Sequence, residues 1–97
     1  MPEILVEPLP GDRPAYAVTV SEGPGTSRHT VTMAPADHER LAPGTPPERV
    51  IEAAFRFLLD REPKEAILKS FDITVIPRYF PEFEEKLAGY VDADAQR

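Results

Sequence analysis

The side chains with the greatest capacity for metal or acid–base chemistry are two histidines, His29 and His38, in a sequence without cysteine. Asp37 and Glu39 flank the second histidine and complete the best ligand set that the chain offers. A zinc or iron site needs three or four ligands whose orientation is held by further hydrogen bonds. The two histidines are nine residues apart, lack a His-x-x-x-His spacing and fall on different predicted elements. We therefore predict no metal ion and no other cofactor, with His29 at a sheet edge and His38 in solvent.

Four carboxylates in the second half of the chain are the candidates for acid–base catalysis: Asp60, Glu62, Glu65 and Asp72. Paired carboxylates can act as general acid and general base. Each of the four also has a structural role, respectively at a helix end, before a proline, in a first helical turn and as an N-cap. The sequence contains no Gly-x-Ser-x-Gly elbow, Walker loop or Gly-x-Gly-x-x-Gly motif. We therefore predict that the chain is not an enzyme, and an accessory enzyme domain is the weaker alternative.

The segment from Lys64 to Lys86 has the layout of a helix-turn-helix, with short predicted helices on both sides of residues 70–72 that carry Lys64, Lys69 and Arg78. A recognition helix needs an uninterrupted polar or basic face. Pro77 and Pro81 interrupt the second helix, and three carboxylates follow, namely Glu82, Glu84 and Glu85. The net charge of −6 also argues against general nucleic-acid binding, which depends on releasing counterions from phosphates. A small nucleic-acid-linked regulator of antitoxin type is therefore the alternative function.

Aromatic residues are concentrated between Pro77 and Phe83, next to an arginine. Pro77 and Pro81 each fix a backbone torsion, so this segment loses little entropy on binding. Tyrosine, phenylalanine and arginine are enriched in protein interfaces, although a small domain also needs its aromatics for the core. The leading prediction is a non-enzymatic protein-interaction or regulatory module that binds an unidentified protein or a second copy. Its candidate interface consists of Arg78, Tyr79, Phe80 and Phe83.

Alternating apolar and polar residues predict a small three-stranded antiparallel sheet over residues 3–33. The second strand places Tyr16, Val18 and Val20 on one face. The third strand places His29, Val31 and Met33 opposite Arg28, Thr30 and Thr32. This pattern predicts one apolar face that helices must cover and one wetter face rich in threonine.

Helical periodicity and proline positions predict several short helices after the sheet, packed on one of its faces. They are expected at residues 35–41, 46–60, 63–70 and 81–87, with Gly89 closing the last, and Asp72 is expected to cap one further turn that Pro77 interrupts. The best-defined helix, 46–60, has Thr45 and Glu48 at the capping-box spacing. The prediction is a single α+β domain over residues 1–91, followed by a disordered tail over residues 92–97.

Three blocks in the C-terminal half resemble a group of small bacterial proteins of unknown function. The blocks are residues 57–68 (FLLDREPKEAIL), 71–73 (FDI) and 78–82 (RYFPE). The resemblance implies a bacterial cytoplasmic setting and brings no activity or ligand with it. No segment is long and apolar enough for a membrane span, and residues 1–3 lack the basic start of a signal peptide. We therefore predict a cytoplasmic protein without membrane contact.

Overall fold

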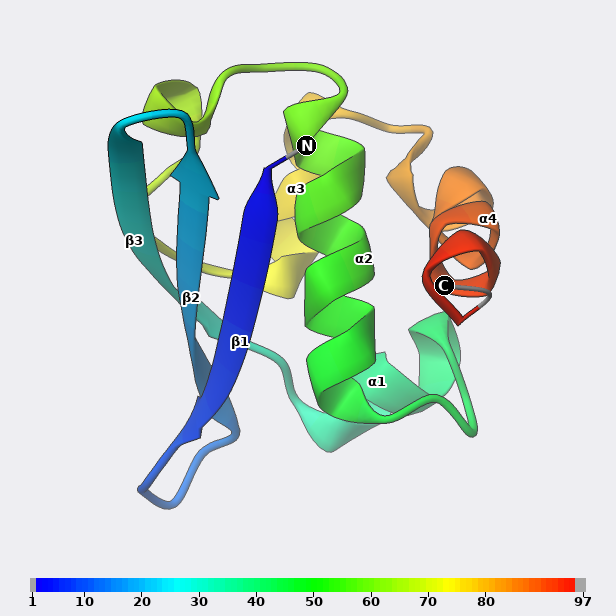
Figure 1. Cartoon of the computed structure of the whole chain (residues 1–97). Coiled ribbons are helices and arrows are strands. Elements are labelled where there is room, and N and C mark those ends of the chain that lie inside the picture. The colour runs from blue at the N-terminus through cyan, green and yellow to red at the C-terminus, as the bar shows by residue number, and fades with distance from the viewer. Residues whose placement is uncertain (1, 96–97) are drawn as a thin grey trace.

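The computed structural model describes residues 2–95 and arranges them as a sheet whose one face is covered by helices (Figure 1). The strands are β1 (Glu3–Leu9), β2 (Ala15–Glu22), β3 (Gly25–Thr32) and β4 (Ser70–Asp72). The helices are α1 (Pro35–Leu41), α2 (Pro47–Leu59), α3 (Ile76–Tyr79) and α4 (Phe83–Ala95), and η1 (Lys64–Ala66) and η2 (Ile73–Val75) are single 3₁₀ turns. The architecture is therefore α+β, as the sequence predicts.

The sheet has four strands in the order β1-β2-β3-β4, which corrects the predicted three-stranded sheet. The first three strands are antiparallel, as expected, whereas β4 pairs parallel to β3. The predicted helix over residues 63–70 is reduced to η1, and the chain then becomes extended. The reason is tertiary, because the Thr30 N–H donates to the Lys69 carbonyl over 2.8 Å. Pairing with the free edge of β3 gives hydrogen-bond partners to backbone groups that would lack them at the ends of a short helix.

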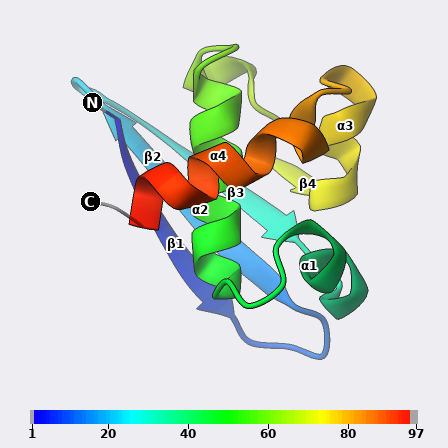
Figure 2. The ribbon, with the colours of Figure 1, turned by 90° about the vertical axis from the view of Figure 1, so that its right-hand side faces the viewer.

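The two faces of the sheet differ as the alternation predicts. One row that crosses β1, β2 and β3 on the covered face consists of Val6, Val18 and His29, and the last two are buried. A row on the opposite face consists of Leu5, Thr19 and Arg28, which are exposed or half-exposed. Figure 2 shows the described helices gathered on one side of the sheet, so the core lies between them and the apolar face.

Helix α2 forms a middle layer between the sheet and α4, which crosses it (Figure 2). Toward the sheet, the Phe55 ring lies 5.3 Å from the His29 ring. Toward α4, the Phe57 ring lies 5.1 Å from Phe83 and 5.7 Å from Tyr90. Because both sides of α2 are covered, its buried residues extend well beyond one stripe: Val50, Ile51, Ala53, Ala54, Phe55, Phe57 and Leu58.

The start of α2 differs from the predicted capping box. Pro46 is the N-cap, and it makes no side-chain capping hydrogen bond. The Thr45 carbonyl instead accepts a hydrogen bond from His38 Nε2, which ties α1 to the start of α2. His38 is therefore half-buried and bonded rather than free in solvent, which corrects the prediction.

Prolines and a glycine do not end the C-terminal helices where the sequence suggests. Pro77 lies in the first turn of α3 and starts that helix instead of interrupting one, because the first turn needs no donor from it. The predicted helix 81–87 is replaced by α4, which passes Gly89 and continues to Ala95. The described part of the predicted tail, residues 92–95, is thus helical, and residues 96–97 lie outside the described residues.

Helix α4 is fastened to the end of α2 by a polar network. Arg61 Nε donates to the Glu82 carboxylate over 3.0 Å, and Arg61 Nη1 donates to the Tyr90 hydroxyl over 3.3 Å. The Tyr90 hydroxyl donates to Asp60 Oδ2 over 2.6 Å. The guanidinium also lies over the Phe57 ring, with Cζ 3.7 Å from its centroid. These contacts hold residues 60–62 in place directly beside the pocket described below.

Candidate functional site

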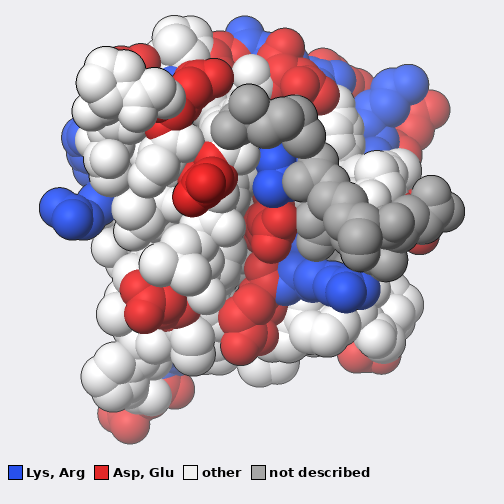
Figure 3. All heavy atoms as spheres, viewed as in Figure 1, with Lys and Arg blue, Asp and Glu red and all other residues white. Residues whose placement is uncertain are grey.

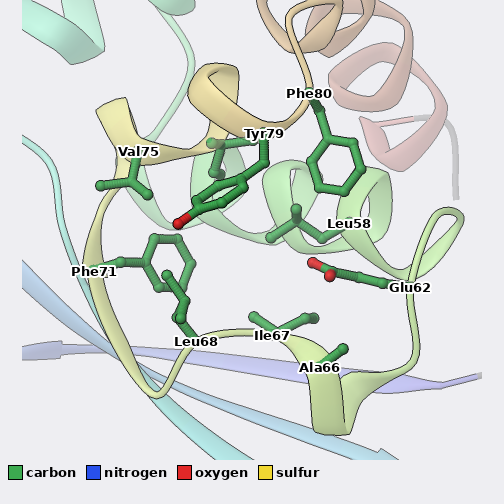
Figure 4. Close-up of a pocket in the computed structure, with 10 residues that line it drawn as sticks. Leu58, Glu62, Ala66, Ile67, Leu68, Phe71, Val75, Tyr79 and Phe80 are labelled. Atoms are coloured by element: carbon green, nitrogen blue, oxygen red, sulfur yellow. The ribbon is translucent and has the colours of Figure 1, made fainter.

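A pocket of about 200 Å³ opens between the end of α2, the segment 66–71 and α3 (Figure 4). Its lining is apolar except for one carboxylate and one tyrosine hydroxyl. The lining residues are Leu58, Glu62, Ala66, Ile67, Leu68, Phe71, Val75, Ile76, Tyr79 and Phe80. A site for a drug-sized ligand usually has about 300–1,000 Å³, so this pocket suits a smaller group such as one side chain.

The floor of the pocket is bonded to strand β3 at three successive points. The His29 Nδ1–H donates to the Leu68 carbonyl over 2.7 Å. One residue further along each segment, the Thr30 N–H donates to the Lys69 carbonyl. Beyond these, the Thr32 hydroxyl donates to Asp72 Oδ1 over 2.6 Å. The segment that carries Leu68 and Phe71 is therefore positioned by the sheet and is not a free loop.

His29 lies inside the core, with 3% of its surface exposed, which corrects its predicted position at a sheet edge. Since a carbonyl only accepts, the hydrogen bond to Leu68 places a proton on Nδ1, and Nε2 then accepts from the Ser27 hydroxyl over 2.8 Å. Burial lowers the pKa of His29 below 6.5; the Leu68 bond opposes this shift, and the charge of Lys69 adds to it. His29 is thus a neutral structural link between β3 and the pocket.

Asp72 joins the end of β4 to the turn η2, as its predicted N-cap role requires. Its Oδ2 accepts from the backbone N–H and the hydroxyl of Thr74, over 3.1 and 2.6 Å. Burial raises the pKa of Asp72, but the hydrogen bonds from Thr32 and Thr74 outweigh it, so that the pKa lies below 3.8. Asp72 therefore fixes the wall of the pocket that leads into α3.

The rim of the pocket carries two of the large apolar side chains that the fold leaves exposed. Tyr79 has 68% of its surface exposed and Leu68 has 48%. Figure 4 shows the Tyr79 ring extending from α3 toward Phe71 and Leu68 across the opening. Both side chains therefore remain in contact with water, although each lies beside an apolar cavity that could bury it.

The four residues of the predicted interface are placed differently from one another. Tyr79 and Phe80 line the pocket, and Phe80 is half-buried with its ring 5.9 Å from Phe57. Arg78 is exposed on α3 but does not line the pocket. Phe83 is fully buried against Phe57, so it belongs to the core and not to an exposed interface.

Glu62 is the one carboxylate in the pocket. Figure 4 shows its carboxylate directed into the cavity from the chain that follows α2. Its backbone N–H donates to the Leu58 carbonyl over 2.9 Å, and Arg61 and Pro63 on either side restrict its position. Burial raises the pKa of Glu62 above 4.5. Among residues 2–95, the Glu62 carboxylate has no hydrogen-bond or ion-pair partner.

The other three candidate carboxylates have structural partners, as their predicted structural roles require. Asp60 accepts from Tyr90, Asp72 accepts from two threonines, and Glu65 accepts from Lys64 Nζ over 2.7 Å. Within the part of the chain that the structure describes, no three histidine or carboxylate side chains gather closely enough to hold a metal ion. The candidate ligands around His38 that the sequence offers therefore form no cluster with His29.

The helix-turn-helix that the alternative function would require is not formed, because η1, β4, η2 and the four-residue α3 occupy the first part of its segment. Lys64 is buried against the β2–β3 hairpin, where a Cβ at Gly25 would lie 3.0 Å from its Nζ. On the face in Figure 3, the described acidic and basic side chains are interspersed and do not form a continuous basic area. None of the described helices is long and apolar enough to cross a membrane.

Sequence reasoning missed Glu62 and Leu68 as members of the site. The sequence presents Glu62 as a candidate catalytic carboxylate with a pre-proline role and places Leu68 in a predicted helix, so it predicts neither as part of a binding pocket. A usable signal is an acid that lies within three residues of the end of an apolar helix and precedes a proline, since the proline restricts its backbone beside the helix end. No family model, curated protein or solved structure matches the chain.

Proposed function

We propose that this chain is a non-enzymatic interaction module that binds a protein partner by taking one of its side chains into the pocket beneath Tyr79. The observation that carries the proposal is the pairing of an open apolar cavity of about 200 Å³ with two exposed apolar side chains at its rim, Tyr79 and Leu68. Interfaces concentrate binding energy where an aromatic anchor closes over a well-packed pocket.

The rigidity of the pocket supports this proposal, because hydrogen bonds and a proline fix its walls in the unbound protein. The floor is bonded to β3 through His29 and Thr32, and Pro77 restricts the backbone of α3. A preformed site loses little conformational entropy on binding. The structural partners of Asp60, Glu65 and Asp72 leave no paired carboxylates in the pocket to support an accessory catalytic role.

A photo-crosslinking amino acid at position 79 tests the proposal in cells of the native host. The same amino acid at Thr26, which is exposed on β3 away from the pocket, serves as the control position. We expect one recurrent partner to be cross-linked from position 79 and not from position 26. Equal cross-linking from both positions would contradict the proposal.

Matched surface variants separate binding from folding. Leu68→Ser and Leu5→Ser each remove an exposed leucine, but Leu68 lines the pocket and Leu5 lies on the outer face of β1. We expect Leu68→Ser to abolish the cross-link from position 79 while Leu5→Ser leaves it intact, with small changes in thermal stability for both. Sedimentation equilibrium of the wild-type protein separates the two kinds of partner. A monomer mass at all protein concentrations indicates a heterologous partner, whereas a mass that increases with concentration indicates self-association.

A further inference from the structure

The carboxylate of Glu62 makes the pocket a poor site for a purely apolar occupant. A half-buried carboxylate that faces apolar side chains keeps its charge only while water or a cation reaches it. An apolar side chain that filled the cavity would remove this hydration and leave the charge uncompensated. A positively charged group would instead pair with it, so Glu62 favours a cationic occupant.

The aromatic lining points to the same kind of occupant. Phe71 on β4, Tyr79 on α3 and Phe80 directly after α3 line the cavity, and Figure 4 shows their rings around the space into which Glu62 is directed. The face of an aromatic ring carries negative electrostatic potential and attracts ammonium and guanidinium groups. The three rings and the carboxylate together give the cavity a negative electrostatic potential inside a mostly apolar lining.

The described part of the chain, residues 2–95, places no cation in the lining of this cavity. None of the described residues that line the pocket is a lysine or an arginine. Arg61, the nearest arginine in sequence, is bonded to Glu82, Tyr90 and the Phe57 carbonyl. The net charge of −6 also favours approach of a basic segment over an acidic one.

On the basis of the proposed function, we propose that the side chain taken into the pocket is a lysine or arginine of a protein partner. Its aliphatic stem packs against Leu58, Ile67 and the three rings, and its charged head pairs with Glu62. Lysine and arginine suit a cavity of about 200 Å³ because each joins a long apolar stem to a small charged head.

The test compares three short peptides that differ in one side chain, acetyl-Gly-X-Gly-amide with lysine, arginine or norleucine as X. Norleucine keeps an unbranched aliphatic stem and lacks the charge. Binding is followed by the backbone amide NMR signals of Leu68, Phe71 and Tyr79 in the folded protein. A single side chain of a few heavy atoms is expected to bind with a Kd in the millimolar range, about 1–10 mM. We expect at least one basic peptide to bind about tenfold more tightly than the norleucine peptide.

Two single-charge variants identify the source of that preference. Glu62→Gln removes the charge in the pocket and keeps the side-chain shape, whereas Glu85→Gln removes one charge from the exposed surface of α4. We expect Glu62→Gln to abolish the preference for the basic peptide and Glu85→Gln to preserve it. Tyr79→Leu keeps an apolar rim without a ring face and should weaken binding of the basic peptide by about two- to fivefold.

Three results would overturn the inference: norleucine binding as tightly as both basic residues, equal losses in the two charge variants, or no response of the pocket signals to either basic peptide. Tight norleucine binding would leave the proposed function intact, because the pocket would still accept a side chain. Loss of the proposed function is measured separately, by cross-linking from position 79 that is no stronger than from the control position.

Discussion

Replacement of Phe55 by alanine tests the placement of α2 as the middle layer of the fold. Phe55 has no exposed surface, and its ring lies 5.3 Å from His29 and 6.0 Å from Phe71. Removal of a buried phenylalanine ring usually costs about 3–5 kcal/mol, and loss of two ring contacts favours the upper part of that range, about 4–5 kcal/mol. A chain of this size has a total stability of about 5–15 kcal/mol, so the variant should be close to unfolding.

Urea denaturation followed by far-ultraviolet circular dichroism measures this loss. With an m-value of about 1–3 kcal/mol per molar urea, a loss of about 4–5 kcal/mol should lower the midpoint by roughly 1.3–5 M. Tyr79→Ala is the matched control, because it also removes an aromatic ring but from a side chain that is 68% exposed; its effect should stay within about 0.5 kcal/mol. A loss below about 1 kcal/mol for Phe55→Ala, or equal losses for the two variants, would refute the reasoning.

Three further variants test the groups around the pocket. Burial lowers the pKa of His29, so the unfolded chain binds a proton more readily than the folded chain as the pH falls below 6.5, and the stability of the wild-type protein decreases in that range. His29→Asn removes this titration, so its urea midpoint should fall less than that of the wild type between about pH 7.5 and about pH 5.5. Thr32→Val removes a 2.6 Å hydrogen bond to Asp72 and should raise the carboxyl pKa in an NMR titration and lower stability by about 1–2 kcal/mol. Burial raises the pKa of Glu62, so ionisation of this carboxyl opposes folding. Glu62→Gln should therefore raise the urea midpoint at neutral pH. This gain should shrink as the pH falls through the folded-state pKa of Glu62, which lies above 4.5. An unchanged midpoint for Glu62→Gln at neutral pH would show that water compensates the carboxylate fully.

Features that depend on local pattern were predicted correctly from the sequence. The alternation in residues 15–20 and 28–33 places Val18 and Val31 on the buried face, because side chains on a strand alternate with a period of two. The helix from Pro35 and the long helix after Pro46 follow from prolines that fit a first helical turn. The N-cap role of Asp72 follows from a short side chain that can reach the backbone two residues ahead.

The tertiary structure decided the features that depend on partners distant in the sequence. The sequence predicts a helix over residues 63–70. The free edge of β3 lies 40 residues before Asp72, where Thr32 bonds to Asp72, and residues 70–72 pair with that edge as a parallel strand instead. Burial of His29 depends on the Leu68 carbonyl, 39 residues later, which accepts a hydrogen bond from Nδ1–H. The pocket arises where β4, α3 and the end of α2 meet, and spacing along the chain does not reveal that meeting. Glu62 therefore reads as an ordinary pre-proline residue in the sequence, and only the packing of these three elements turns it into the charged group of an apolar pocket.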